Sequence, residues 1–116
     1  MTKPTNVMAT ATQHFKSQLN GDLEKIIVPE WETDVYYRQI SSFATESKII
    51  ELQQSGKTVE ALVESLIAKA LTPDGKPMFS RMDKTSLLNE VDPKVILRVC
   101  TVLNQATSDY EEVRKN

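Results

Sequence analysis

Hydrophobic positions in the middle of the chain recur with the period of an α-helix. In the stretch 58–70 they follow the i, i+3, i+4, i+7 template closely, at Val59, Leu62, Val63, Leu66, Ile67 and Ala70. The stretch 42–55 has a similar apolar pattern, made by Phe43, Ile49, Ile50 and Leu52. Ser41 or Ser42 can cap its start, and Gly56 can end it in a left-handed conformation. We therefore predict two consecutive helices, the second with Thr58 as its N-cap.

Two further helices are predicted toward the end of the chain. Residues 84–91 have apolar side chains at helical spacing, and Asp83 can cap their start. Asp92 and Pro93 then begin the stretch 93–105, with Asp as cap and Pro in the first turn. This last helix is apolar around most of its circumference, so we expect it to be the central and most buried element.

A different pattern precedes these helices. Residues 23–28 and 35–40 are rich in β-branched and aromatic side chains and flank a polar segment that starts at Pro29. Such runs around a turn predict a β-hairpin near residues 23–40. Residues 23–105 are thus expected to form a single globular domain of class α+β, mainly α, in which an N-terminal hairpin packs on a bundle of about four helices.

The two ends of the chain lack this patterning. Residues 1–22 are rich in Thr, Asn, Gln and Ser, so we expect a flexible segment in which residues 9–19 are at most weakly helical. Residues 106–116 lose apolar periodicity and become charged, which predicts a polar C-terminal tail. The sequence has neither an export signal nor an apolar run of membrane-spanning length, so a cytoplasmic location is expected.

Charge and cysteine content narrow the possible functions. The formal net charge of -2 and the pI near 5.4 provide no global positive field for nucleic acid or anionic lipid. Cys100 is the only cysteine, which excludes an intrachain disulfide and a cysteine-based metal cage and fits a reducing compartment. We expect Cys100 to pack as a small apolar side chain.

Three polar features could support chemistry, but each has a simpler structural explanation. His14 is the only histidine and has no acid or nucleophile near it in sequence, so a surface position is expected. The segment 55–58, Ser-Gly-Lys-Thr, resembles the end of a phosphate-binding loop, but Glu51 stands where that motif requires glycine. The spacing of the acidic group Glu30, Glu32 and Asp34 matches no calcium loop. We therefore predict no enzymatic activity, no metal and no cofactor.

The predicted helix pair 42–70 could also be a DNA-reading motif. The side chains that its second helix is expected to turn outward are Glu60, Glu64, Ser65 and Lys69. Two acids beside one base would be repelled by phosphates, so DNA binding is disfavoured. A small helical DNA-binding transcription regulator nevertheless stays the alternative function, and an enzyme whose site assembles from scattered polar residues is a third possibility.

Large aromatic side chains gather around the predicted hairpin. Trp31 lies in the polar turn, and Tyr36 and Tyr37 follow it. Rings with an apolar body and a polar tip are favoured interface anchors, although Trp31 could equally cover the core of its own domain. We take Trp31, Tyr36, Tyr37 and Arg38 as candidate partner-binding residues, with Tyr110 in the tail as a further candidate.

The segments 28–31, Val-Pro-Glu-Trp, and 35–38, Val-Tyr-Tyr-Arg, resemble the opening signature of tail assembly chaperones of long-tailed phages with flexible, non-contractile tails. Later features occur in a similar order: the amphipathic helical pair, a Leu-x-x-Asp-Gly-x-x-x-Phe turn at 71–79, and a final apolar helix ending Val-Leu-Asn at 102–104. The likeness spans about residues 26–105. Glu32 departs from it, because a glycine is expected after the tryptophan, and this leaves the shape of the hairpin turn open.

The resemblance implies a helper protein in the host cell cytoplasm that is absent from the finished virion. It would bind the tape measure protein and help to recruit tail tube subunits during tail assembly, without catalysing a reaction. In such families a ribosomal frameshift also yields a longer product of the same gene, which would be a further partner. A small domain that acts in many copies along a rod gains avidity, so we also expect a homo-oligomer and neither nucleic acid nor membrane as partner.

Overall fold

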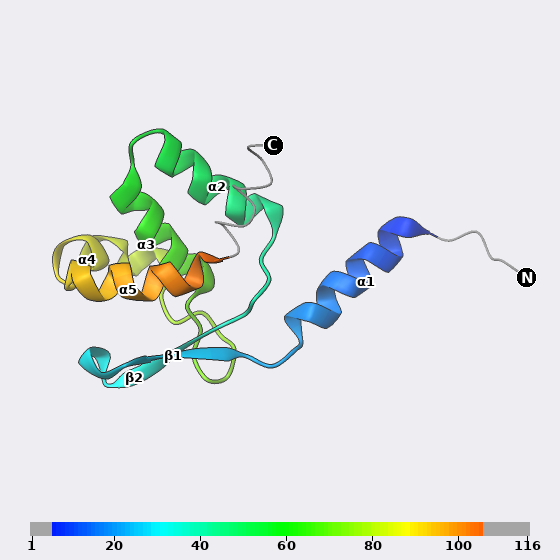
Figure 1. Ribbon diagram of the computed structural model, residues 1–116, viewed down its shortest axis with the longest axis horizontal. Coiled ribbons are helices and arrows are strands. Elements are labelled where there is room, and N and C mark those ends of the chain that lie inside the picture. Colours follow the sequence, from blue (N-terminus) through cyan, green and yellow to red (C-terminus); the bar gives the residue numbers. More distant parts are fainter. Residues whose placement is uncertain (1–5, 106–116) are drawn as a thin grey trace, which may run out of the picture.

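The computed structural model describes residues 6–105, which form five α-helices, a two-stranded hairpin and two short 3-10 helices. The elements are α1 (Val7–Leu19), β1 (Glu24–Val28), η1 (Pro29–Trp31), β2 (Thr33–Tyr37), α2 (Phe43–Gln54), α3 (Thr58–Lys69), η2 (Arg81–Asp83), α4 (Lys84–Asn89) and α5 (Pro93–Leu103). Helices α2 to α5 form one group with the hairpin along one side, and α1 projects away from them (Figure 1). The predicted class, α+β and mainly α, is confirmed.

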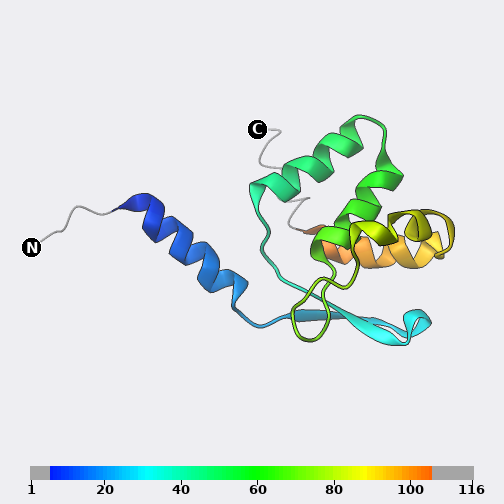
Figure 2. The ribbon, with the colours of Figure 1, turned by 180° about the vertical axis from the view of Figure 1, so that it is seen from behind.

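Helix α1 is longer and more regular than predicted, because the segment 9–19 was expected to be at most weakly helical. Asn6 caps its start, where the side-chain Oδ1 accepts a hydrogen bond from Ala9 N at 3.1 Å. No residue of α1 is buried, and the helix projects away from the other elements (Figure 2). The segment has a capping residue at its start and contains neither Gly nor Pro, so nothing in it interrupts the helix.

The hairpin has the predicted position, and its register turns alternate side chains toward the helices. Strands β1 and β2 are antiparallel, with Glu24 opposite Tyr37 and Val28 opposite Thr33. Val28 and Val35 are fully buried, whereas Ile27 on the other face is exposed. Between the strands, η1 is closed by Glu32, whose φ of 55° and ψ of 31° lie in the left-handed region. The turn therefore has the backbone shape that glycine prefers, although glutamate occupies it.

The connection between α3 and η2 fastens the hairpin to the helices. Leu71 and Tyr36 exchange two backbone hydrogen bonds, of 3.0 and 2.7 Å. The connection thus pairs with the edge of β2 through a single antiparallel bridge. The connection then turns back as predicted, with Gly75 at a φ of 80° and Leu71 bridged to Pro77.

Helix α2 begins and ends by the predicted local chemistry. Ser42 accepts a hydrogen bond from Thr45 N at 3.3 Å, and Gly56 closes the helix at a φ of 77°, followed by a 2.8 Å bond from Lys57 N to Leu52 O. The predicted Thr58 cap is wrong. Lys57 occupies the N-cap position of α3 without a side-chain bond, and Thr58 is already the first helical residue.

Helix α3, and not α5 as predicted, is the central element, because α2, α4 and α5 all pack against it. The buried residues of α5 lie on one face, and its other face exposes Leu97. The predicted cap of α5 is confirmed, since Asp92 Oδ1 accepts a 2.9 Å bond from Lys94 N. Asp83, expected to cap α4, instead accepts a bond from Ser80 N, and α4 ends at Asn89.

Two positions assigned to the apolar faces of α2 and α3 point to solvent instead. Phe43 is 74% exposed and Val59 is 61% exposed. Each lies in the first turn of its helix, where neighbouring elements give less cover than along the rest of the helix. Helical spacing alone did not reveal this difference.

Candidate functional site

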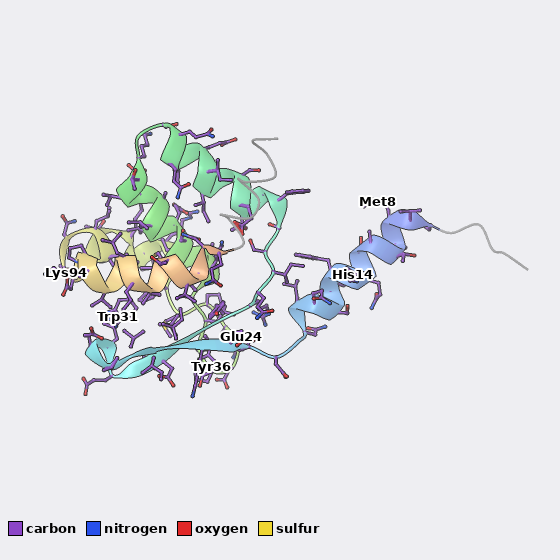
Figure 3. The ribbon with its side chains drawn as sticks, in the orientation of Figure 1. Met8, His14, Glu24, Trp31, Tyr36 and Lys94 are labelled. Atoms are coloured by element: carbon purple, nitrogen blue, oxygen red, sulfur yellow. The ribbon has the colours of Figure 1, made fainter. Side chains whose placement is uncertain are left out.

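Trp31 lies at the turn of the hairpin, at the end of the molecule far from α1 (Figure 3). Its ring meets the ring of Phe79 edge-on, with centroids 5.8 Å apart and planes at 81°. The two rings belong to an open cavity of about 330 Å³, lined by Trp31, Thr33, Met78, Phe79, Leu87 and Val91. Trp31 packs against the core and remains half-buried, so its ring covers the core and leaves part of its surface open.

This cavity is built from three segments that are distant in sequence. The hairpin turn supplies Trp31, the connection after α3 supplies Phe79, and α4 with the following residues supplies Leu87 and Val91. Among the residues that the structure describes, Thr33 is the only polar one in the lining, so the cavity is suited to apolar side chains. The sequence marked Phe79, Leu87 and Val91 as apolar, but it contained no signal that they meet beside Trp31.

An ion pair braces the turn that carries Trp31. Arg98 on α5 donates two hydrogen bonds, of 2.8 and 2.7 Å, to the two carboxylate oxygens of Glu30. The hydrogen bonding from Arg98 lowers the pKa of Glu30 to about 2. Glu30 is therefore ionised across the physiological range and holds η1 against α5.

The acidic group around the turn does not converge on one point. Glu30 pairs with Arg98, Asp34 lies 3.7 Å from Lys25 across the hairpin, and Glu32 is exposed. Within residues 6–105 no three His, Cys, Asp or Glu side chains are placed to hold a metal ion.

The predicted partner-binding residues are not brought together on one surface. Tyr36 lies on the face of the hairpin turned away from the helices (Figure 3), whereas Tyr37 packs against the core. Burial is the main cause that raises the pKa of Tyr37. Arg38 donates from Nε to the carbonyl oxygen of Leu19, the last residue of α1. Tyr110 lies outside the described residues.

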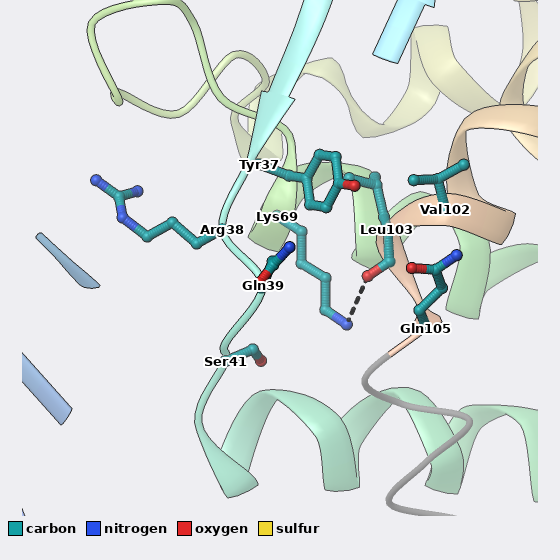
Figure 4. Close-up of a pocket in the computed structure, with 8 residues that line it drawn as sticks. All are labelled: Tyr37, Arg38, Gln39, Ser41, Lys69, Val102, Leu103 and Gln105. Atoms are coloured by element: carbon teal, nitrogen blue, oxygen red, sulfur yellow. Dashed lines mark hydrogen bonds between the residues drawn. The ribbon is translucent and has the colours of Figure 1, made fainter. Parts of the chain in front are cut away.

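A buried polar cluster joins α2, α3 and the end of α5. The Lys69 ammonium donates to both carboxylate oxygens of Glu46, at 2.9 and 3.2 Å. It also donates to the Leu103 carbonyl at 3.3 Å (Figure 4) and to Asn104 Oδ1 at 3.1 Å. Burial lowers the pKa of Lys69, while the hydrogen bond and attraction from Glu46 partly oppose that effect.

Three residues predicted to face solvent on α3 are therefore buried: Glu64, Ser65 and Lys69. Ser65 Oγ donates to Ala61 O at 2.8 Å and accepts from Asn104 Nδ2 at 2.9 Å. Glu64 binds Arg81, whose hydrogen bond is the main cause that lowers the pKa of Glu64. The prediction failed because neighbouring elements close over the polar face of α3. The outward polar side chains that would make α3 a candidate DNA-reading helix are thus largely enclosed within the domain.

The remaining candidate features are structural. His14 is exposed on α1, and the segment 55–58 is the junction of α2 and α3. Cys100 is buried and donates from Sγ to Leu62 O at 3.3 Å, and burial raises the pKa of its thiol to about 12. Across residues 6–105 no helix has the length and apolar character needed to cross a membrane.

Comparison with known proteins places this arrangement among solved folds. The hairpin followed by the group α2 to α5 is similar in fold to a solved tail assembly chaperone, the class that the sequence resemblance indicated. The particular solved structure is that of the bacteriophage HK97 tail assembly chaperone, with a TM-score of 0.50 over 83% of this chain and 96% of that chain. The two sequences are 21% identical, so the likeness is one of fold. No family model and no curated protein matches the sequence.

Proposed function

We propose that this protein is a phage tail assembly chaperone, which binds the tape measure protein and helps to recruit tail tube subunits while the tail is built. The observation that carries the proposal is the fold shared with the HK97 chaperone over nearly all of that chain. The protein acts in the host cell cytoplasm, catalyses no reaction and is absent from the finished virion. The order of sequence motifs from 26 to 105 supports the same assignment.

The Trp31 cavity is the binding surface we propose for the tape measure protein. A rod-like partner is expected to present apolar side chains at i, i+3 and i+4 along a helix, and such a row fits an open apolar cavity. Trp31 and Phe79 supply the aromatic anchors, and the Glu30–Arg98 pair holds the turn in place before binding. Tyr36, on the outer face of the hairpin, provides a second contact area for a tail protein.

We also propose that copies of the protein associate with one another. Helix α1 has no buried residue, and Val7 and Met8 near its free end are 71% and 72% exposed. An arm of this kind gains burial by lying on another copy, and repeated weak contacts add up along a long partner. A longer frameshift product would share the same domain and would enter the same assembly.

Co-expression with the tape measure protein, followed by pull-down, tests the proposal. Trp31→Ala removes the anchor, and Thr33→Arg places a bulky charge at the cavity without removing a core side chain. Both variants are expected to lose capture of the partner while keeping the wild-type circular dichroism spectrum. Phe43→Ala is the matched control, since it removes an exposed ring at a position outside this cavity, and it should capture the partner normally.

The outcomes distinguish the proposed chaperone function from the proposed role of the Trp31 cavity. Absence of any capture by the wild-type protein would refute the proposed function. Full capture by both folded cavity variants would refute the Trp31 cavity as the surface while leaving the chaperone assignment intact.

A further inference from the structure

The hairpin has two edges, and among residues 6–105 only the edge of β2 is paired with another segment. Tyr36 of β2 donates to and accepts from Leu71, so its backbone N–H and C=O point away from β1. Lys25 is the register partner of Tyr36, and its N–H and C=O therefore point to the opposite side, the outer edge of β1. Alternation along the strand gives Ile27 the same orientation as Lys25.

This outer edge of β1 is open. Within the described part of the chain, no backbone hydrogen bond outside the hairpin involves Lys25 or Ile27. Ile27 is 66% exposed, and an open strand edge that carries an apolar β-branched residue is a template for another strand. Lysine often protects such edges, but Lys25 Nζ lies 3.7 Å from Asp34 Oδ2 of its own hairpin, so its charge is partly offset. The edge thus offers its N–H and C=O groups to an additional strand.

The residue order of β1 favours the same strand of a second copy as that partner. In an antiparallel pair the outward residues must face one another. If Lys25 faced Lys25 of the second copy, like charges would lie opposite each other. If Ile27 faced Ile27, Lys25 would face Pro29, which has no N–H to donate. When Lys25 of each copy faces Ile27 of the other, neither problem arises.

We propose that β1 pairs with β1 of a second copy in this antiparallel register, with a two-fold axis at Ile26. Each pair of Lys25 and Ile27 exchanges two backbone hydrogen bonds, and Glu24 lies opposite Val28, so no like charges are opposed. The two hairpins then form one sheet in the order β2, β1, β1 and β2. This inference names an interface for the self-association proposed above and rests on that part of the proposed function.

The pairing has a consequence for the Trp31 cavity. Because the two β1 strands are antiparallel, the hairpin turns that carry Trp31 lie at opposite ends of the shared sheet. Ile26 and Val28 of both copies are on one face of this sheet, so both groups of helices lie on that face. The dimer presents two cavities to one long partner, which raises the overall strength of binding without a new contact at either cavity.

Hydrogen exchange measured by NMR on the full-length chain tests the pairing directly. The amides of Lys25 and Ile27 point to the open edge, so they should exchange fast in dilute protein. Their exchange should slow roughly tenfold when about nine-tenths of the chains are associated, as judged by sedimentation. The amides of Ile26 and Val28 point toward β2 and are the internal controls, which should be protected at every concentration.

Charge variants test the register. Ile27→Lys places a lysine opposite Lys25 of the second copy, twice across the axis, and should weaken association about tenfold. Val59→Lys is the matched control, because Val59 is 61% exposed on α3, and it should associate normally. The double variant Ile27→Lys/Lys25→Glu restores opposite charges between the copies and should recover association. In each copy the introduced lysine lies opposite Asp34, so the circular dichroism spectrum should be unchanged.

The outcomes separate this interface from the rest of the proposed function. Fast exchange of the Lys25 and Ile27 amides in associated protein would overturn the pairing and leave association through another surface, such as α1. Normal association of Ile27→Lys, or no recovery in the double variant, would also overturn it. A wild-type protein that stays monomeric at high concentration would refute the pairing together with the self-association. Capture of the tape measure protein is measured separately and decides the chaperone assignment.

Discussion

Replacing Lys69 by methionine tests the buried ion pair that joins α2 to α3. The side chains of Lys69 and Glu46 are only 8% and 5% exposed. The substitution takes the ammonium away from the Glu46 carboxylate, the Leu103 carbonyl and Asn104 Oδ1. Removing one member of a buried pair typically costs about 3–5 kcal/mol. Since a small domain is stable by only about 5–15 kcal/mol, Lys69→Met should lose a large part of the free energy of unfolding.

The same physics predicts that removing both charges is far less harmful. Burial is the main cause that lowers the pKa of Lys69, and the desolvation of two buried charges can exceed the attraction between them. Apolar residues in place of a buried pair are often neutral or stabilising, by about 1–4 kcal/mol. The double variant Lys69→Met/Glu46→Leu should therefore recover at least about 2 kcal/mol relative to Lys69→Met.

Urea unfolding followed by far-UV circular dichroism measures these differences, with the midpoint and the m value compared among variants. Lys48→Met is the matched control, because Lys48 is 52% exposed and lies 3.5 Å from Glu64. The Lys48→Met control should lower the free energy of unfolding by less than about 1 kcal/mol. The reasoning is wrong if Lys69→Met lowers the free energy of unfolding no more than Lys48→Met does. It is also wrong if the double variant is as unstable as Lys69→Met.

The remaining predictions concern the turn, its ion pair and the cysteine. Glu32→Gly relieves a left-handed residue and should raise the free energy of unfolding by about 1 kcal/mol; a lower melting temperature would contradict this. In an NMR titration Glu30 should titrate near pH 2, and Arg98→Gln should return its pKa toward 4.5. Because the folded pKa is depressed, the stability from this pair is present above pH 4.5 and is lost as the pH falls toward 2. Cys100 should resist thiol reagents at neutral pH until the protein unfolds, as mass spectrometry can follow; rapid labelling of the native protein would disprove its burial.

Helix caps, helix ends and turns could be predicted from the sequence wherever a few neighbouring residues determine the backbone conformation. The Ser42 cap, the Gly56 stop, the turn at Gly75 and the Asp92–Pro93 start all lie where their side chains predicted. The hairpin followed from two β-rich runs, and the order of motifs led to the fold that the HK97 chaperone shares.

Tertiary structure alone decided which helix faces are covered. Lys69 and Glu64 have the residue types and spacing of a solvated face, yet neighbouring elements enclose them. Phe43, in contrast, is apolar and was expected on a covered face, yet it is exposed to solvent. The Trp31 cavity likewise needs Phe79 and Val91, which approach it only when the chain folds back. The physical reason is that periodicity along a helix identifies the residues that share a face. Whether another element covers that face depends on contacts between segments far apart in the chain, which no local pattern encodes.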